Sequence, residues 1–197
     1  MLYFTLLLVF FYASHSWLAS QKVKDFVLKR SAFCFRFYRI FYTLFAVMLW
    51  SVITWLFVCK HDYSYIFLPQ AEVKNAGIFL AATGLLVIIW SILRYGFVDF
   101  TGLNAIVNTN HQSVAKPVLN TSGVNSIVRH PIYTGVIMAF LGLILIIPTP
   151  MTAAGILISF IYLEIGIRLE EEKLENEFGE SYRQYKLKVK KVIPFLY

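Results

Sequence analysis

A short polar motif in the carboxyl-terminal half, Arg129-His130-Pro131-Ile132-Tyr133, has residue types that suit anion binding. Proline is favoured in the first turn of a helix, so the motif predicts that a helix begins here. The first N–H groups of a helix have no partners within it and carry the positive end of its dipole, so they can receive a carboxylate. A plain helix start with a snorkelling arginine and an interfacial tyrosine explains the same residues. The motif alone leaves both interpretations open.

A second group of charged residues lies further along the chain, between Glu164 and Glu172. Glu164, Arg168 and Glu171 are spaced to share one helix face, where they could form an orienting ion pair or part of a functional site. Glu170, Glu171 and Glu172 point in different directions around a helix, so at most one or two of them can face a pocket. A solvated acidic face and a ligand site both fit this spacing.

The elements that carry these residues must lie in a membrane. Of the 197 residues, 58% are apolar and 15% are charged, and the mean hydropathy is +0.66. Soluble domains have about a quarter charged residues, so a soluble globular protein is excluded. The 18 Phe and 12 Tyr exclude disorder, and two Cys are too few for a disulfide scaffold. No spacing typical of metal ligands occurs.

Long uncharged runs predict the membrane spans, because a helix needs about 20 apolar residues to cross a bilayer. The runs cover residues 2–19, 40–59, 75–93 and 132–163. As one helix the last run would be about 48 Å long, beyond a hydrocarbon core of about 30 Å. The segment Pro148-Thr149-Pro150 predicts that this run folds back as a hairpin. We therefore predict an all-α fold, a polytopic membrane helical bundle of about five transmembrane helices with a terminal helical hairpin.

Lys and Arg predict the orientation, because cytoplasmic loops keep positive charge. Residues 20–39 hold six of them and residues 168–197 hold seven, whereas the opposite side has Lys60 and Lys74. The protein is therefore expected to be multi-pass, with its amino terminus outside and its carboxyl terminus in the cytoplasm. Basic residues beside the spans explain the net charge of +7 without nucleic acid as a partner.

A hairpin returns its second helix to the level at which the first begins. Arg129, His130 and Tyr133 should therefore lie near residues 164–172, forming a pocket at the membrane face. Beyond the hairpin, a stripe of apolar and aromatic residues predicts an amphipathic cytoplasmic tail helix. The stripe consists of Leu174, Phe178, Tyr182 and Tyr185.

Two motifs stand in order in the carboxyl-terminal half, separated by the predicted hairpin. They are Leu119, Gly123 and Arg129-His130-Pro131-x-Tyr133, then Glu170-Glu171-x-x-Leu174-x-x-x-Phe178-Gly179-x-x-Tyr182-x-x-Tyr185 and Pro194. This pattern resembles the integral-membrane methyltransferases of the isoprenylcysteine carboxyl methyltransferase and phospholipid methyltransferase group.

The amino-terminal half carries a second, looser resemblance. Its residues are His15-Ser16-x-x-Ala19-Ser20-x-x-Val23-Lys24, Tyr38-Arg39 and Asp99-Phe100-x-Gly102-Leu103. They are similar to the subgroup that contains nurim, the NnrU-type proteins and the methanethiol methyltransferases. This second similarity implies nothing firm about chemistry.

The first resemblance implies that S-adenosylmethionine is the methyl donor, bound at the cytoplasmic end of the hairpin. Its methionine carboxylate would lie near the helix start at His130, and its ammonium would face Glu170. Arg168 and Glu171 are the predicted catalytic residues. The other predicted cofactor-binding residues are Leu119, Asn120, Asn125, Arg129, Pro131 and Tyr133.

The chain also departs from the family pattern. In the isoprenylcysteine enzymes a substrate-facing arginine stands four residues before the motif glutamate, where this chain has Gly166. Arg168 is nearest, but two residues along a helix rotate its direction by about 200 degrees. Asn125 stands where the family commonly has an aromatic residue. The glutamine that the subgroup has in the preceding loop could be matched by Asn108, Asn110 or Gln112.

These features predict an S-adenosylmethionine-dependent integral-membrane methyltransferase. Its acceptor would be small or lipophilic: an isoprenylcysteine carboxylate, a thiol or a lipid amine. Residues 1–98 would form three amino-terminal transmembrane helices. Residues 99–197 would form the cofactor-binding region, with the hairpin at 132–167. A non-catalytic accessory or structural membrane protein of the nurim and NnrU type is the alternative.

Overall fold

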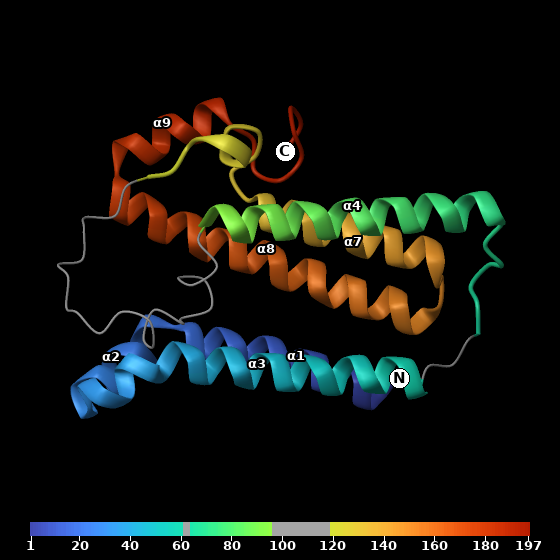
Figure 1. Ribbon diagram of the computed structural model, residues 1–197, viewed down its shortest axis with the longest axis horizontal. Coiled ribbons are helices and arrows are strands. Elements are labelled where there is room, and N and C mark those ends of the chain that lie inside the picture. Colours follow the sequence, from blue (N-terminus) through green and yellow to red (C-terminus); the bar gives the residue numbers. More distant parts are fainter. Residues whose placement is uncertain (61–63, 96–118) are drawn as a thin grey trace. The chain divides into compact units, whose positions relative to one another are not determined.

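The computed structural model describes residues 1–60, 64–95 and 119–197, which form two compact units (Figure 1). The first unit contains α1 (Leu2–Ala19), α2 (Gln21–Arg30) and α3 (Ala32–Lys60). The second contains α4 (Ala71–Tyr95), the 3-10 helix η1 (Gly123–Ser126), α7 (Pro131–Ile146), α8 (Pro150–Phe178) and α9 (Glu180–Lys188). Among these residues no strand occurs, and the predicted all-α fold is confirmed.

In the first unit, two serines divide the chain into three helices. Ser20 and Ser31 both have extended backbone angles, and each interrupts the helix before it. The Ser20 hydroxyl donates to the carbonyl of Trp17 at 2.6 Å, and the Ser31 hydroxyl accepts the N–H of Cys34 at 3.2 Å. These local side-chain bonds replace helical ones, which is how serine ends and begins helices. The short basic helix α2 lies between the two breaks.

The long helices α1 and α3 pack against each other through aromatic side chains. Phe4 of α1 lies 5.8 Å from the ring of Phe57, and Phe11 lies 5.4 Å from the ring of Trp50. At the other end of the pair, the Tyr38 hydroxyl donates to the carbonyl of Leu18 at 2.7 Å. The order of these contacts shows that α1 and α3 are antiparallel.

In the second unit, α4 and α7 approach each other at glycines spaced seven residues apart. A Cβ atom on Gly84 would lie 2.5 Å from the carbonyl oxygen of Gly135, and one on Gly142 would lie 2.5 Å from that of Gly77. Such distances are possible only because glycine has no side chain, and small residues let membrane helices approach in this way. The glycine pairs therefore place α7 directly against the backbone of α4.

The hairpin turn lies where the prolines predict it. α7 ends at Ile146 and α8 begins at Pro150, with Pro148 and Thr149 buried in the turn. Thr149 caps α8, because its hydroxyl accepts the N–H of Thr152 at 3.3 Å. The N–H of Ile66 donates to the carbonyl of Pro148 at 2.7 Å, which ties the segment before α4 to the turn.

The helix lengths support an integral membrane protein. Within the described residues, α1, α3, α4 and α8 are long and apolar enough to cross a bilayer. With 16 residues α7 is about 24 Å long, shorter than a hydrocarbon core of about 30 Å. The fifth span therefore stays a prediction, as does the orientation of the termini.

The tail differs from the single continuous helix that the apolar stripe predicts. α8 ends at Phe178, Gly179 has a φ of 56°, and α9 begins at Glu180. A positive φ is accessible to glycine without the penalty that a side chain brings, so the chain turns here. The turn directs α9 back toward η1.

The predicted division at residue 98 stays a prediction, and by compactness α4 belongs with the carboxyl-terminal helices.

The glycine contacts predict that Gly84→Leu lowers the stability of the second unit. Its side chain would meet the backbone of Gly135, and such overpacking costs about 1 to 3 kcal/mol. Thermal unfolding of the purified protein in phosphatidylcholine nanodiscs would measure the loss. Ala82→Leu is the matched control, because Ala82 is exposed on the same helix and should leave the midpoint unchanged. Equal midpoints for the two variants would contradict this packing.

Candidate functional site

The segment before α7 is held in an extended form by the carboxyl-terminal tail. The N–H of Arg129 donates to the carbonyl of Lys190 at 2.8 Å, and the N–H of His130 donates to that of Lys191 at 3.0 Å. A parallel bridge between Val128 and Lys190 belongs to the same pairing. The backbone N–H groups of Arg129 and His130 are therefore already hydrogen-bonded to the tail.

The start of α7 leaves two backbone donors available. His130 is the N-cap and Pro131, which has no N–H, occupies the first helical position. The first N–H in α7 with a partner among the described residues belongs to Thr134, which donates to the carbonyl of His130 at 3.0 Å. The N–H groups of Ile132 and Tyr133 therefore remain at the positive end of the helix.

Arg129 and Glu171 form a buried ion pair at this point. Oε1 of Glu171 accepts from Nε of Arg129 at 2.9 Å and from Nη2 at 2.7 Å. The side chains are 9% and 12% exposed. Nη1 of Arg129 donates to the carbonyl of Val189, and to that of Lys186 at 3.3 Å. The guanidinium thus links α8, α9 and the tail.

His130 lies between two carboxylates. Its Nε2 is 3.2 Å from Oε1 of Glu171, and its Nδ1 is 3.6 Å from Oε2 of Glu170. Burial lowers the pKa of His130, but hydrogen bonds and charge interactions with the two carboxylates raise it more, so the net shift is above the ordinary value. Glu171 is enclosed, whereas the side chain of Glu170 is 45% exposed. Glu170 is therefore the carboxylate of this pair that a ligand can reach.

α9 closes the cluster on the side of Glu171. Lys186 places Nζ 3.6 Å from Oε2 of Glu171, so that carboxylate faces an arginine, a lysine and a histidine. The Tyr185 hydroxyl donates to the carbonyl of Asn125 in η1 at 2.6 Å. Nδ2 of Asn125 in turn donates to the carbonyl of Asn120 at 2.9 Å. The loop before α7 is therefore fixed to α9.

A family model matches the part of the chain that contains the cluster of Arg129, His130, Glu170 and Glu171. The model described as phospholipid methyltransferase matches residues 73–181, more than half of the chain. The chain belongs to the phospholipid methyltransferase family. This confirms the resemblance that the two motifs carry.

Curated relatives point to the same group of proteins. The chain is 38% identical to methanethiol S-methyltransferase 1 of Bradyrhizobium diazoefficiens over 104 residues, which cover 49% of the chain and 34% of the relative. It is 42% identical to the methanethiol S-methyltransferase of Pseudomonas deceptionensis over 89 residues, 42% of the chain and 32% of the relative. It is 31% identical to the protein-S-isoprenylcysteine O-methyltransferase of Xenopus laevis over 119 residues, 59% of the chain and 41% of the relative.

The matches cover about a third of the length of the two methanethiol S-methyltransferases. No solved structure matches the chain.

The structure of this family member brings most of the predicted site residues together. Arg129, His130, Glu170 and Glu171 form one cluster, with Pro131 and Tyr133 in the first turn of α7. Asn120 and Asn125 lie in or beside η1, and Leu119 directly precedes them. The loop residues Asn108, Asn110 and Gln112 lie outside the described residues.

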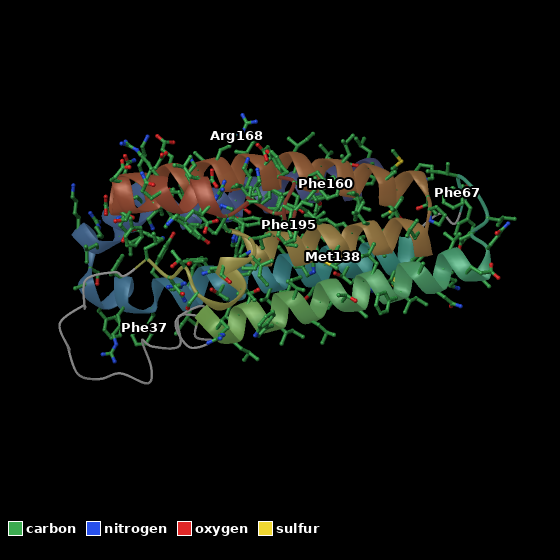
Figure 2. The ribbon with its side chains drawn as sticks, turned by 90° about the horizontal axis from the view of Figure 1, so that it is seen from above. Phe37, Phe67, Met138, Phe160, Arg168 and Phe195 are labelled. Atoms are coloured by element: carbon green, nitrogen blue, oxygen red, sulfur yellow. The ribbon has the colours of Figure 1, made fainter. Side chains whose placement is uncertain are left out.

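Arg168 lies apart from this cluster. Figure 2 shows it projecting outward from α8, and its side chain is 74% exposed. Its Nε donates to Oε1 of Glu164 at 2.9 Å, which matches the ion-pair interpretation of these two residues. Lys191 also approaches Glu164, with Nζ at 3.4 Å. The catalytic roles of Arg168 and Glu171 stay predictions.

Gly166 faces the aromatic side of the cluster. A Cβ atom at this position would lie 3.5 Å from the Tyr133 hydroxyl, which is ordinary van der Waals contact, so Gly166 lies beside the tyrosine. The Tyr133 ring packs edge-on against the ring of His130, with centroids 5.6 Å apart. The uncharged Tyr133 hydroxyl therefore lies beside the position at which the isoprenylcysteine enzymes are expected to have an arginine.

Two residues of this region were not predicted from the sequence. Lys186 is one basic residue among several in the tail, and its contact with Glu171 depends on the turn at Gly179. Arg94 lies against η1, since a Cβ atom on Gly123 would be 3.3 Å from its Nη2. The 28 residues between Arg94 and Gly123 gave no local signal for this contact.

Glu171→Gln should destabilise the fold by about 3 to 5 kcal/mol, because it leaves the buried guanidinium of Arg129 without a counter-charge. The thermal unfolding midpoint in nanodiscs would report the loss. Glu172→Gln, an exposed neighbour on the same helix, is the control and should have little effect. An equal shift in the two variants would show that the pair is not structural.

The raised pKa of His130 predicts that stability falls with increasing pH. A group with a raised folded-state pKa contributes fully below its unfolded value, about 6.5 for histidine, and loses this contribution as pH rises through the folded value. The unfolding midpoint should therefore decline as the pH rises above about 6.5, the unfolded-state pKa of histidine. His130→Gln should lack this component of the decline. The same pH profile in both proteins would assign the decline to another group.

Proposed function

We propose that this chain is an S-adenosylmethionine-dependent membrane methyltransferase that acts on a small thiol. When bound, S-adenosylmethionine carries a methyl group on a positively charged sulfur. This methyl group can be transferred to the sulfur atom of an acceptor thiol. The observation that carries the proposal is the half-exposed Glu170 beside the open N-terminus of α7.

The methionine part of the donor has a carboxylate and an ammonium on the same carbon atom. Its binding therefore needs an anion-binding group and a carboxylate close together. The N–H groups of Ile132 and Tyr133 supply the first of these, assisted by the helix dipole. Glu170 supplies the second, because Glu171 is already neutralised by Arg129, His130 and Lys186.

Glu171 acts in this proposal as a positioning residue. Its carboxylate fixes the guanidinium of Arg129 and one ring nitrogen of His130, and His130 in turn orients Glu170 through its other ring nitrogen. Arg129, His130 and Glu171 are buried in this chain of contacts, so Glu170 is held in place before a ligand arrives. Such preorganisation lowers the entropic cost of binding.

The surroundings of Gly166 favour a thiol over a carboxylate acceptor. A carboxylate would need a nearby cation, and Arg168, the basic residue nearest to Gly166 in sequence, is paired with Glu164. A thiol has no such need, and the group beside Gly166 is the uncharged Tyr133 hydroxyl. The similarity to methanethiol S-methyltransferases over part of the chain supports the same choice.

Glu170→Gln should weaken binding of S-adenosylmethionine about tenfold or more, because a charge-assisted hydrogen bond contributes roughly 1.5 to 3 kcal/mol. Titration calorimetry on the protein in nanodiscs measures this effect, and Glu172→Gln is the control. Equal affinities for the two variants would overturn the role of Glu170.

A labelled-methyl assay tests the acceptor, with a small alkanethiol, a prenylcysteine and phosphatidylethanolamine as substrates. We expect transfer to the thiol. Transfer only to another acceptor would overturn the thiol assignment. Donor binding without any transfer would favour a non-catalytic protein of the nurim and NnrU type.

A further inference from the structure

A cavity of about 400 Å³ lies in the first unit, at the junction of α1 and α3. α1 lines it with Phe11, His15 and Ala19, and α3 lines it from Arg39 to Ser51. The twelve-residue separation on α3 corresponds to about 18 Å along the helix, so the cavity is elongated. Its volume lies in the range of small-molecule sites, roughly 300 to 1,000 Å³.

The far part of this cavity is walled by aromatic and aliphatic groups. The rings of Phe11 and Trp50 are in contact at 5.4 Å, and Ala46 and Val47 complete the wall. The His15 ring stacks on Phe11 at 5.9 Å and meets the edge of Tyr42 at 6.3 Å. Burial of hydrocarbon against these groups is favourable by about 25 cal/mol for each Å² removed from water.

His15 lines the cavity with its imidazole ring. Its Nδ1 is buried with no hydrogen-bond partner. Buried N–H groups without a partner are rare, so Nδ1 carries the lone pair and Nε2 carries the proton. No described residue hydrogen-bonds Nε2, and His15 lines the cavity, so this N–H is available to a ligand.

Arg39 supplies a positive charge at the end of the cavity nearest the start of α3. It is exposed, and among the described residues it has no hydrogen-bond or ion-pair partner. Guanidinium groups bind carboxylates and phosphates through paired N–H donors. One end of the cavity is therefore cationic, and the rest is apolar.

We propose that this cavity binds a single-chain anionic amphiphile, with its carboxylate or phosphate head at Arg39 and His15 and its hydrocarbon chain along Phe11 and Trp50. The volume suits one chain rather than the two of a membrane phospholipid. The proposal goes beyond methyl transfer, because every residue that lines this cavity lies in the first unit and the Glu170 cluster lies in the second.

The test uses the full chain in phosphatidylcholine nanodiscs and a fluorescent polyene fatty acid as the probe. Wild-type protein should bind it saturably, and Arg39→Gln should weaken binding about tenfold or more because a charge-assisted contact is lost. Arg36→Gln is the matched control, since it makes the same charge change on the same helix outside the cavity. Unfolding midpoints of the three proteins show whether the fold is intact.

Displacement of the probe identifies the head group. Palmitate and a lysophosphatidic acid represent the carboxylate and phosphate sources, and the stronger competitor is the preferred one. The uncharged alcohol of the same chain length should displace the probe from wild-type protein less well than palmitate does. From Arg39→Gln, the alcohol and palmitate should displace the probe equally well. His15→Phe keeps an aromatic ring but removes the N–H, and should weaken binding by a smaller factor than Arg39→Gln. Absence of saturable binding to wild-type protein, or equal binding by Arg39→Gln and Arg36→Gln, would overturn the proposal.

Discussion

The carboxylate of Glu171 lies within ion-pair distance of Arg129, His130 and Lys186. The arrangement of the second unit depends on this buried charge cluster. Burial of charge is costly unless it is paired and hydrogen-bonded. Arg129 meets this requirement with bonds to α8 and to carbonyls of α9 and the tail. Arg129 therefore has to meet residues 42 to 60 positions further along the chain for these charges to be accommodated.

The unequal arms of the hairpin determine which residues can take part. α7 has 16 residues and α8 has 29, so α8 extends well past the level at which α7 begins. Arg129 and His130 precede α7 in an extended form, which advances about 3.3 Å per residue and carries them to the level of Glu171. The close glycine contacts with α4 hold α7 in place while this pairing forms.

The same cluster separates two carboxylates that are neighbours in sequence. Glu171 is saturated by basic groups, whereas Glu170 is half-exposed and contacts one nitrogen of His130 and the Tyr133 hydroxyl. A structural carboxylate and a ligand-accessible one thus stand next to each other on α8. The proposed donor site depends on this division, since a fully neutralised carboxylate could not bind an ammonium.

The sequence by itself determined the helical membrane fold, the hairpin and the family. Uncharged runs, two prolines and two ordered motifs are local signals that do not depend on contacts with distant segments. The prolines placed the turn at residues 148–150 correctly. The hairpin alone predicted that the Arg129 motif lies close to Glu170 and Glu171.

Only the tertiary structure decided which glutamate is enclosed, that α9 folds back after Gly179, and that Lys186 and Arg94 approach the site. The approach of Lys191 to Glu164, beside the local pair with Arg168, likewise depends on the position of the tail. Local periodicity specifies the face of a helix, but the partner of a charge depends on which distant segments pack beside it.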